Sequence, residues 1–553
     1  MSGVLLQRAR LVDARTGLSS DPVDVRVRDG RVTEIGPGLR PHGRSSGGGA
    51  EERIDLDGRW VVPGLWDAHT HMTQWALARQ RLDVSAATSA AHAASLVAER
   101  LRDDPPPAGA PLVGFGFRDA LWADEPTAEL LDAAVLEAGS PGRASARGSA
   151  LPAVVLVSGD LHCGWLSTSA AQRFGLPVGG LLREHAWFEV LDRLGEAPEA
   201  LADGWVADAA SAAASRGVVG VVDFERANAW EAWPRRVAAG QDGLRVVCSV
   251  WPESLDLVVS RGLRTGDALP MPMPMPVSMS MPMSMSVSVP MSVSVPMSVS
   301  VPAPLHSTAH PLAPLLTMGP LKVITDGSLN TRTAYCHQPY PGLSGAQAHG
   351  ELSVPPAELA ELLARAAAAG LECAVHAIGD RASSLALDAF ESTGARGSIE
   401  HAQLLADDDV ERLARLGLTA SVQPEHAMDD RDVADRLWAG RTSRAFAFAS
   451  LHRAGARLAL GSDAPVAPLD PWLAIGAAVD RARDGRSAWH PEQRLTAATA
   501  LLASTRGRAV VREGDVADLA VLDADPLSVR DDAIRHMPVA ATLLGGRWTH
   551  RTL

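Results

Sequence analysis

The run Val61-Val62-Pro63-Gly64-Leu65-Trp66-Asp67-Ala68-His69-Thr70-His71 joins an apolar segment to two closely spaced histidines. We expect a strand over residues 61–69, the first of eight core strands. Residues two apart in a strand point to the same side, so the end of this strand presents His69 and His71 together. Two imidazoles at one point suit a divalent metal such as zinc. Taken alone, the pair is equally consistent with two unrelated histidines.

Seven further apolar runs of strand length follow along the chain, with helical patterns between them. Residues 356–369, for example, show a helical pattern that ends at Gly370. Strands that alternate with helices are typical of a (β/α)8 barrel. We therefore expect an α/β fold with a TIM-like barrel over residues 61–507. The later candidate strands cover residues 218–223, 244–250, 320–325, 372–376, 397–401, 418–423 and 457–462.

The two ends of the chain differ from its middle. Residues 1–60 and 508–553 alternate apolar and polar positions between turn signals, as short antiparallel strands do. They predict one small β-sandwich domain built from both termini. Residues from about 72 to 215 are too many for one strand-to-helix connection and predict an insertion in the barrel. Residues 270–304 repeat proline, methionine, serine and valine without charge and predict an exposed low-complexity loop.

Composition narrows the classes of function. The 553 residues carry a formal charge of −14 and are 46% hydrophobic, which argues against a nucleic-acid partner and favours a large core. No apolar run of about 18 residues is present, so we expect no membrane partner. The four cysteines lie far apart and form no CxxC pair, which suits a reducing compartment. We expect a cytoplasmic protein with a small-molecule substrate, and leave open whether it forms a homo-oligomer.

Lys322 is the only lysine in the chain, and every other member of its 51 basic residues is arginine. It lies in the strand-like run Gly319-Pro320-Leu321-Lys322-Val323-Ile324-Thr325-Asp326-Gly327. Arginine stays protonated in proteins, whereas a buried lysine can lose its proton. A neutral amine can take up CO2 to become a carbamate, which is an oxygen ligand for metals. The plainer interpretation is a leftover lysine on a partly buried strand.

Three more candidate ligands end later strands. His376, His401 and Asp463 follow the fifth, sixth and eighth candidate strands in turn. Catalytic groups of such barrels gather at the carboxyl ends of the strands. Together with His69, His71 and Lys322, these residues therefore predict a single site. Glu400, next to His401, is expected to face away from that site by strand alternation and to be structural.

This order of motifs resembles the amidohydrolase superfamily, and more closely its YtcJ-like, amidohydrolase-3 branch. The resemblance covers nearly the whole chain except residues 270–304. The motifs that carry it are Asp67-Ala68-His69-Thr70-His71, Gly159-Asp160-Leu161-His162, Lys322-Val323-Ile324-Thr325-Asp326-Gly327-Ser328-Leu329, His376-Ala377-Ile378-Gly379-Asp380-Arg381, Ile399-Glu400-His401-Ala402, Gln423-Pro424-Glu425-His426, Gly461-Ser462-Asp463-Ala464-Pro465 and Gly514-Asp515-Val516-Ala517-Asp518-Leu519.

The resemblance implies a ligand set for one or two divalent ions, with zinc expected and two ions favoured. His69 and His71 would bind the first metal, and Asp463 would contact it. His376 and His401 would bind the second metal. A carbamylated Lys322 would bridge the two.

The resemblance also implies a reaction. A metal generates hydroxide near neutral pH, the hydroxide attacks a carbonyl carbon, and Asp463 moves the proton to the leaving nitrogen. We therefore expect hydrolysis of a non-peptide carbon–nitrogen bond in an amide, an N-acyl or formamide group, or a cyclic amide. Two alternatives are the same site acting on an ester or carbamate, or in an isomerase or lyase step. A third is a catalytically silent binding or scaffold protein that keeps the fold.

Three further residues are candidates for substrate binding. Arg332 could hold a substrate carboxylate, although arginine in this arginine-rich chain also serves in surface ion pairs. His162 and His426 could reach the pocket, and a role in the core or behind the ligands fits each of them equally well.

Overall fold

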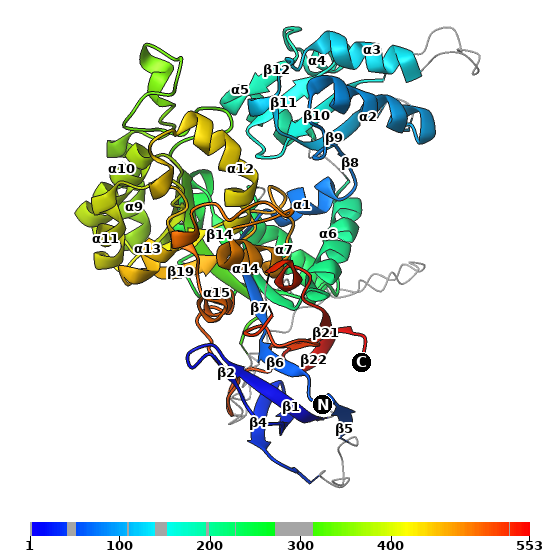
Figure 1. Ribbon diagram of the computed structural model, residues 1–553, viewed down its shortest axis with the longest axis vertical. Helices are drawn as coiled ribbons and strands as arrows, with labels where there is room; N and C mark the ends of the chain where they lie inside the picture. The colour runs from blue at the N-terminus through cyan, green and yellow to red at the C-terminus, as the bar shows by residue number, and fades with distance from the viewer. Residues whose placement is uncertain are drawn as a thin grey trace, which may run out of the picture.

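The computed structural model describes residues 3–40, 51–107, 110–138, 152–194, 198–226, 228–270, 313–529 and 531–553. Three parts follow one another along its long axis: a sheet made from both termini, a central barrel, and a domain inserted into the barrel (Figure 1). Except for Pro270, the low-complexity loop predicted over 270–304 lies outside the described residues.

The barrel is built from eight parallel strands whose order in the sheet is their order in the chain. Apolar side chains fill each strand because both faces are covered, by the barrel interior and by the helices outside. This sheet confirms the predicted (β/α)8 architecture. Its strands are β7 (Leu65–Thr70), β13 (Val218–Asp223), β14 (Arg245–Val250), β15 (Leu316–Ile324), β16 (Cys373–Ala377), β17 (Gly397–His401), β18 (Thr419–Val422) and β19 (Arg457–Leu460).

The barrel closes where the segment after β19 meets the end of β7. The Asp463 amide donates to the His69 carbonyl at 2.7 Å, and the His71 amide donates to the Ala464 carbonyl at 2.8 Å. The backbones approach so closely that a Cβ at Gly461 would lie 2.7 Å from the His69 nitrogen. Closure therefore needs glycine at this position, and it places the first and last candidate ligands side by side.

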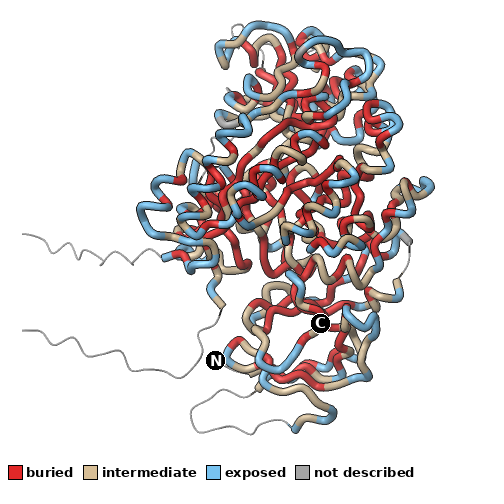
Figure 2. Tube along the Cα trace, turned by 90° about the vertical axis from the view of Figure 1, so that its left-hand side faces the viewer, coloured by how far each residue is buried: buried red, intermediate tan, exposed pale blue. Residues whose placement is uncertain are grey.

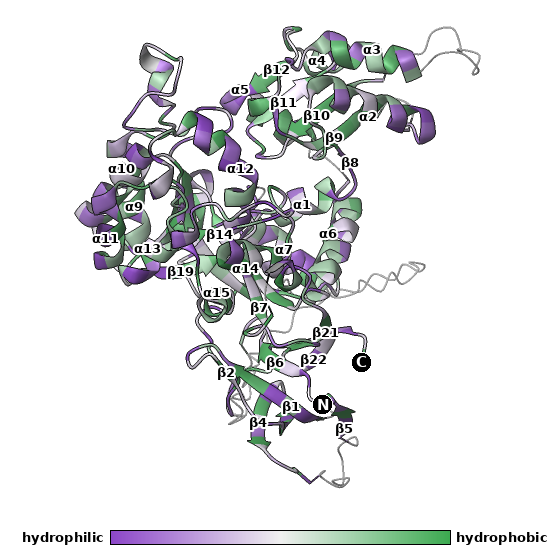
Figure 3. Ribbon diagram, in the orientation of Figure 1, coloured by the Kyte–Doolittle hydropathy of each residue, from purple (hydrophilic) through white to green (hydrophobic). Residues whose placement is uncertain are grey.

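Helices cover the outside of the barrel and bury one apolar stripe each. In α9, Leu359, Leu362, Leu363 and Ala366 are buried at helical spacing, and the helix ends before Gly370. Figure 2 shows buried residues throughout the barrel, and Figure 3 shows the hydropathy of the residues in the same elements. These helices are α1 (Met72–Ala78), α6 (Glu199–Ala214), α7 (Ala229–Ala238), α8 (Leu255–Ser260), α9 (Pro356–Ala368), α10 (Asp380–Thr393), α11 (Asp407–Arg415), α12 (Pro424–Leu437), α13 (Phe448–Arg453), α14 (Pro471–Asp480) and α15 (Ala497–Ala503).

A nine-stranded sheet combines strands from both ends of the chain. Its long strand β1 belongs to both halves of the sheet, because residues 4–9 pair with β3 and residues 10–11 pair with β6. Side chains from both halves share one apolar core. The strands are β1 (Val4–Asp13), β2 (Leu18–Ser19), β3 (Val23–Arg28), β4 (Arg31–Gly36), β5 (Glu52–Asp55), β6 (Trp60–Pro63), β20 (Leu519–Leu522), β21 (Val539–Leu544) and β22 (Arg547–Arg551).

The single strand expected over residues 61–69 is wrong. The strand is interrupted at Gly64. β6 pairs with β20 in the terminal sheet, and β7 is the first strand of the barrel. A Cβ at Gly64 would lie 2.3 Å from a methyl group of Val219, which leaves room for glycine alone. The alternation of apolar residues did not show this change of sheet, because both short strands are apolar.

The insertion has its own five-stranded sheet and its own apolar cores. α1 and α6, at the two ends of the expected 72–215 segment, pack against each other on the barrel instead. Among the described residues, no helix has both the length and the apolar character to cross a membrane. The elements of the insertion are β8 (Leu82–Asp83), α2 (Ala90–Asp103), β9 (Leu112–Phe117), α3 (Ala128–Ala138), β10 (Val154–Ser158), β11 (Cys163–Leu166), α4 (Thr168–Phe174), β12 (Leu181–Arg183) and α5 (Glu184–Leu194).

A buried ion pair joins the barrel to the terminal sheet and generates a prediction about stability. Both Arg245 Nε and Nη2 donate to the Asp518 carboxylate, at 2.6 and 3.0 Å. Asp518→Ala leaves the Arg245 charge buried and unpaired, so we expect a loss of about 3–5 kcal/mol in the free energy of unfolding. Urea unfolding of Arg245→Met/Asp518→Leu should show a smaller loss than the single variant.

The exposed ion pair between Asp242 and Arg547, at 2.9 Å, provides the matched control. Asp242→Ala should cost about 0–1 kcal/mol. Equal losses in the buried single variant and the double variant would contradict the account.

Candidate metal centre

A cavity opens to solvent at the carboxyl ends of the barrel strands. All six candidate metal ligands line it, and so do His162 and His426. Arg332 differs, because it is exposed to solvent and is not among the residues that line the cavity. The six ligands that the cavity brings together are His69, His71, Lys322, His376, His401 and Asp463.

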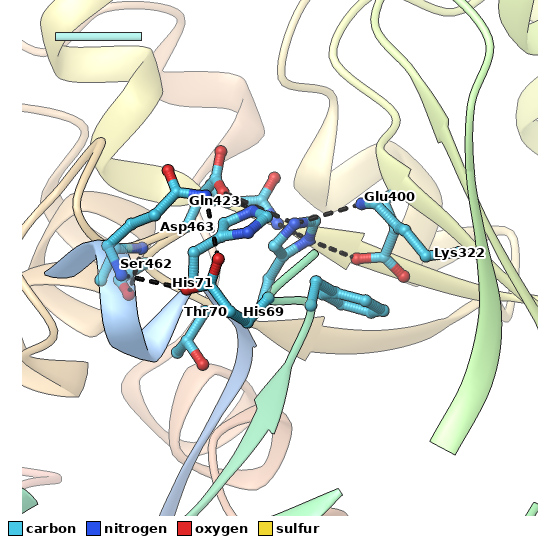
Figure 4. Close-up of polar contacts among 12 residues, drawn as sticks. His69, Thr70, His71, Lys322, Glu400, Gln423, Ser462 and Asp463 are labelled. Atoms are coloured by element: carbon cyan, nitrogen blue, oxygen red, sulfur yellow. Dashed lines mark hydrogen bonds and ion pairs between the residues drawn. The ribbon is translucent and has the colours of Figure 1, made fainter. Parts of the chain in front are cut away.

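Barrel closure brings three of these ligands together (Figure 4). Asp463 Oδ1 lies 3.3 Å from His71 Nε2 and 3.5 Å from His69 Nε2. His401 joins them, since single ligand atoms of His69, His401 and Asp463 all lie within 4.8 Å of one another. A carboxylate oxygen and several imidazole nitrogens facing a common space form a donor set typical of zinc.

His376 and His401 form the other half of the cluster. Their ring centroids lie 4.4 Å apart, and the His401 ring lies 5.1 Å from that of His69. His376 Nε2 and His401 Nδ1 are buried without a hydrogen-bond partner. Buried polar atoms are rarely left without a hydrogen bond, so these two nitrogens, of which His376 Nε2 lies 3.5 Å from Asp326 Oδ1, fit a site for a cation.

The electrostatics of the cluster favour the ligand forms of the histidines. Burial lowers the pKa of His69, His376 and His401 well below the usual value, and the Lys322 ammonium contributes to each shift. The rings are therefore neutral near pH 7, as metal ligands must be. Burial of these side chains thus prepares them to bind a cation.

Lys322 is fully enclosed in the same cluster. Its Nζ lies 3.2 Å from His69 Nε2 and 4.4 Å from the centre of the Phe224 ring. Burial lowers the pKa of Lys322 to about 8, against the opposing effect of the Glu400 and Asp463 carboxylates. A sizeable fraction of the amine is therefore neutral near physiological pH, as CO2 uptake requires.

Glu400 contradicts the expectation from strand alternation. Its Oε2 accepts a hydrogen bond from His69 Nδ1 at 2.6 Å, and its other oxygen accepts one from Ser398 (Figure 4). The expectation failed because His401 has a φ of 70°, outside the strand region. That turn brings the His401 ring to the cavity, while Glu400 contacts His69 from behind and does not line the cavity.

Glu184 is a second site residue that sequence reasoning missed. Its Oε2 accepts a hydrogen bond from His162 Nδ1 at 2.8 Å, and its Oε1 accepts one from Thr333 at 2.6 Å. Burial opposes a charge on His162, but the Glu184 carboxylate outweighs it and raises the pKa of His162 to about 9. Glu184 opens α5 outside every motif, so no spacing in the sequence pointed to it.

His426 and Asp160 complete the polar wall. His426 Nε2 lies 4.0 Å from Asp463 Oδ2, and its ring lies parallel to that of His401. Asp160 Oδ2 accepts a hydrogen bond from Ser328 Oγ at 2.8 Å, which ties the insertion to the loop after the strand of Lys322. The insertion is thus fixed directly over the ligand cluster.

Several known proteins are similar to this chain in sequence. Protein LONG AFTER FAR-RED 3 of Arabidopsis thaliana is 26% identical over 523 residues, covering 87% of this chain and 78% of that protein. The putative amidohydrolase YtcJ of Bacillus subtilis (strain 168) is 33% identical over 256 residues, covering 42% of this chain and 47% of that protein. N-substituted formamide deformylase of Arthrobacter pascens is 28% identical over 208 residues, covering 34% of this chain and 38% of that protein.

The fold also has a solved counterpart. The crystal structure of an uncharacterized metal-dependent hydrolase from Pyrococcus horikoshii OT3 has a TM-score of 0.70 and 23% sequence identity, covering 96% of this chain and 99% of that one. The amidohydrolase family model matches residues 52–550, which is nearly the whole length. The chain therefore belongs to the amidohydrolase family.

Proposed function

We propose that this protein is a metal-dependent hydrolase of a non-peptide carbon–nitrogen bond in an amide, an N-acyl or formamide group, or a cyclic amide. Membership of the amidohydrolase family supports a hydrolase. The observation that carries the proposal is that four histidines, one lysine and one aspartate line one cavity, and all but His71 are buried. A relative named N-substituted formamide deformylase supports this kind of bond.

The residues divide into two ligand groups. His69, His71 and Asp463 would hold one divalent ion, for which we propose zinc. His376 and His401 would hold a second ion, and a carbamylated Lys322 would lie between the two. When bound, such ions supply a lowered pKa for water and a polarised carbonyl group.

Asp463 is the residue placed to move protons. Its Oδ1 faces His69 and His71, while its Oδ2 faces His426 across 4.0 Å. One oxygen can therefore stay with the ligand cluster while the other takes the proton of the attacking water. Asp463 then returns this proton to the leaving nitrogen, as a general acid.

Carbamylation would change the charge at the centre of the cluster. The neutral Lys322 Nζ forms a bond to the carbon of CO2 and releases one proton; counted from the ammonium form, two protons leave and a cation becomes an anion. The reaction needs the neutral amine, so it is favoured as the pH rises through the Lys322 pKa of about 8. The product removes the ammonium charge beside His69, His376 and His401 and places an oxygen ligand among them.

Glu400 would act by holding His69 in place. The bond from His69 Nδ1 to Glu400 puts the ring proton on Nδ1 and leaves Nε2 to face Asp463 and Lys322. Carboxylates behind a ligating histidine fix its tautomer and its orientation in this way. Glu400 is therefore a positioning residue.

The reaction class is tested with Asp463→Asn and a panel of amides, lactams and esters. We expect the zinc-loaded protein to hydrolyse amides or lactams faster than matched esters. Asp463→Asn should lower kcat about 10²–10⁴-fold, the usual contribution of general acid–base catalysis. Cleavage of esters with no cleavage of amides or lactams would overturn the bond assignment, and no turnover of any panel member by the metal-loaded protein would overturn the hydrolase.

The role of Lys322 is tested with Lys322→Ala. We expect this variant to lose most of its metal and activity, with partial rescue by a short carboxylic acid that takes the place of the carbamate. Lys322→Arg keeps the positive charge, fills the cavity and should not be rescued. Elemental analysis and kcat/KM measure both effects, and full metal content with wild-type activity in Lys322→Ala would refute the bridge.

The role of Glu400 is tested with Glu400→Gln. The amide is a weaker acceptor for His69 Nδ1, so we expect metal affinity to fall about 10–100-fold. Competition with a chromophoric chelator gives this value without reference to activity. Glu358→Gln, an exposed position on α9, is the control and should bind metal normally. An unchanged affinity in Glu400→Gln would show that the contact is not needed.

A further inference from the structure

We propose that the insertion forms a binding subsite for an uncharged apolar group of the substrate, of the size of an aryl ring or a branched alkyl chain. This inference rests on the proposed function, because the group would be attached to the bond that the metal centre cleaves. The subsite is formed by Phe188 and Leu191 of α5 together with Leu161.

Helix α5 carries two adjacent rows of apolar side chains that differ in burial. Trp187 and Val190 are fully buried in the insertion's own core. Phe188 and Leu191 each lie one position further along, so they form a second apolar stripe that is half-buried and lines the cavity. Both rows pack against the insertion's core, but Phe188 and Leu191 stay half-buried, and an apolar ligand in the cavity would cover the part of each that remains exposed.

The second stripe lies close to the proposed ligands. The Phe188 ring meets the His162 ring edge-on, with centroids 5.5 Å apart, and the His162 ring lies 6.3 Å from that of His376. The barrel continues the apolar surface with Ile324 and Ile378. Each follows a proposed ligand by two residues, so the apolar wall extends to the metal centre itself.

The two arginines on the cavity wall and His162 already have acidic partners. Arg118 pairs with Asp429 at 2.9 Å, and His162 pairs with Glu184 at 2.8 Å. Arg226 pairs with Glu253 at 3.4 Å and lies over the Trp251 ring at 5.1 Å.

A substrate carboxylate that bound here would therefore lose its hydration. On the described part of this wall it would gain no unpaired arginine or histidine charge in return. Such a burial is costly. Asp160 and Asp430 also line the cavity and would repel an anion. The wall therefore favours a neutral substituent over a charged one.

The test compares kcat/KM of the full-length, zinc-loaded protein across amides that differ in one substituent. N-methyl, N-butyl and N-benzyl formamides form one series, and acyl groups of the same sizes on methylamine form another. In at least one series we expect the largest apolar group to exceed methyl by ~10-fold or more. An N-carboxymethyl amide should fall below its N-propyl counterpart by a similar factor.

The variants Phe188→Ala and Leu191→Ala should reduce the benzyl-to-methyl ratio of kcat/KM at least threefold. Leu136→Ala, at an exposed position on α3 of the same insertion, is the matched control and should keep the wild-type ratio. Circular dichroism and metal content verify that each variant is folded and loaded.

Three results would overturn the subsite: a benzyl-to-methyl ratio near one in both series, an unchanged ratio in both α5 variants, or a preference for the carboxymethyl amide. Esters with the same substituents separate this inference from the proposed function. If esters alone are cleaved but follow the same order, the subsite is supported and the carbon–nitrogen assignment fails. If nothing is cleaved, calorimetric binding of N-benzylformamide and N-methylformamide decides, because a benzyl preference lost in the α5 variants supports the subsite and equal binding refutes it.

Discussion

Closure of the barrel is the constraint on which the site depends. Two backbone hydrogen bonds join the segment after β19 to β7, and the contact between Gly461 and His69 leaves no room for a side chain. Asp463 is brought beside His69 and His71 only by this contact, although nearly four hundred residues separate them in the chain. The same contact fixes the cylinder, so the ends of β15, β16 and β17 point their side chains at the same space.

Burial then determines the protonation states of the residues that barrel closure brings together. Three imidazoles and one amine share a buried space, where burial disfavours protonation of each and the Lys322 ammonium further lowers the pKa of His69, His376 and His401. A cation bound there would gain neutral nitrogen ligands at little cost in released protons. Glu400 provides the opposite charge behind His69 and fixes its orientation, so the cluster is both electron-rich and ordered.

The barrel and the meeting of the ligands could be predicted because both follow from the regular alternation of apolar strand-length runs and helical patterns in the sequence. Apolar runs separated by helices predict parallel strands, and the carboxyl ends of such strands share one edge, which places His376 and His401 near His69. The exceptions are departures from that regularity. Gly64 divides one apolar run between two sheets, and the positive φ of His401 cancels the alternation that was expected to turn Glu400 away.

Other features had no periodic signal at all. Arg332 follows the strand of Lys322 closely, but the loop at this point turns its side chain to solvent. Phe188 lines the cavity, and Glu184 contacts His162 of its wall, because the insertion folds as a unit over the barrel. That placement depends on long-range contacts such as the pair between Arg118 and Asp429. A single sequence does not show which residues of an inserted domain face the parent fold.

The most direct measurement of the central claim is anomalous diffraction from crystals of the zinc-loaded protein, recorded on both sides of the zinc absorption edge. The account predicts two anomalous peaks inside the cluster, one beside His69, His71 and Asp463 and the other beside His376 and His401, with additional density on Lys322 Nζ between them. An absence of anomalous signal among these six residues, in crystals that bind zinc elsewhere, would contradict it.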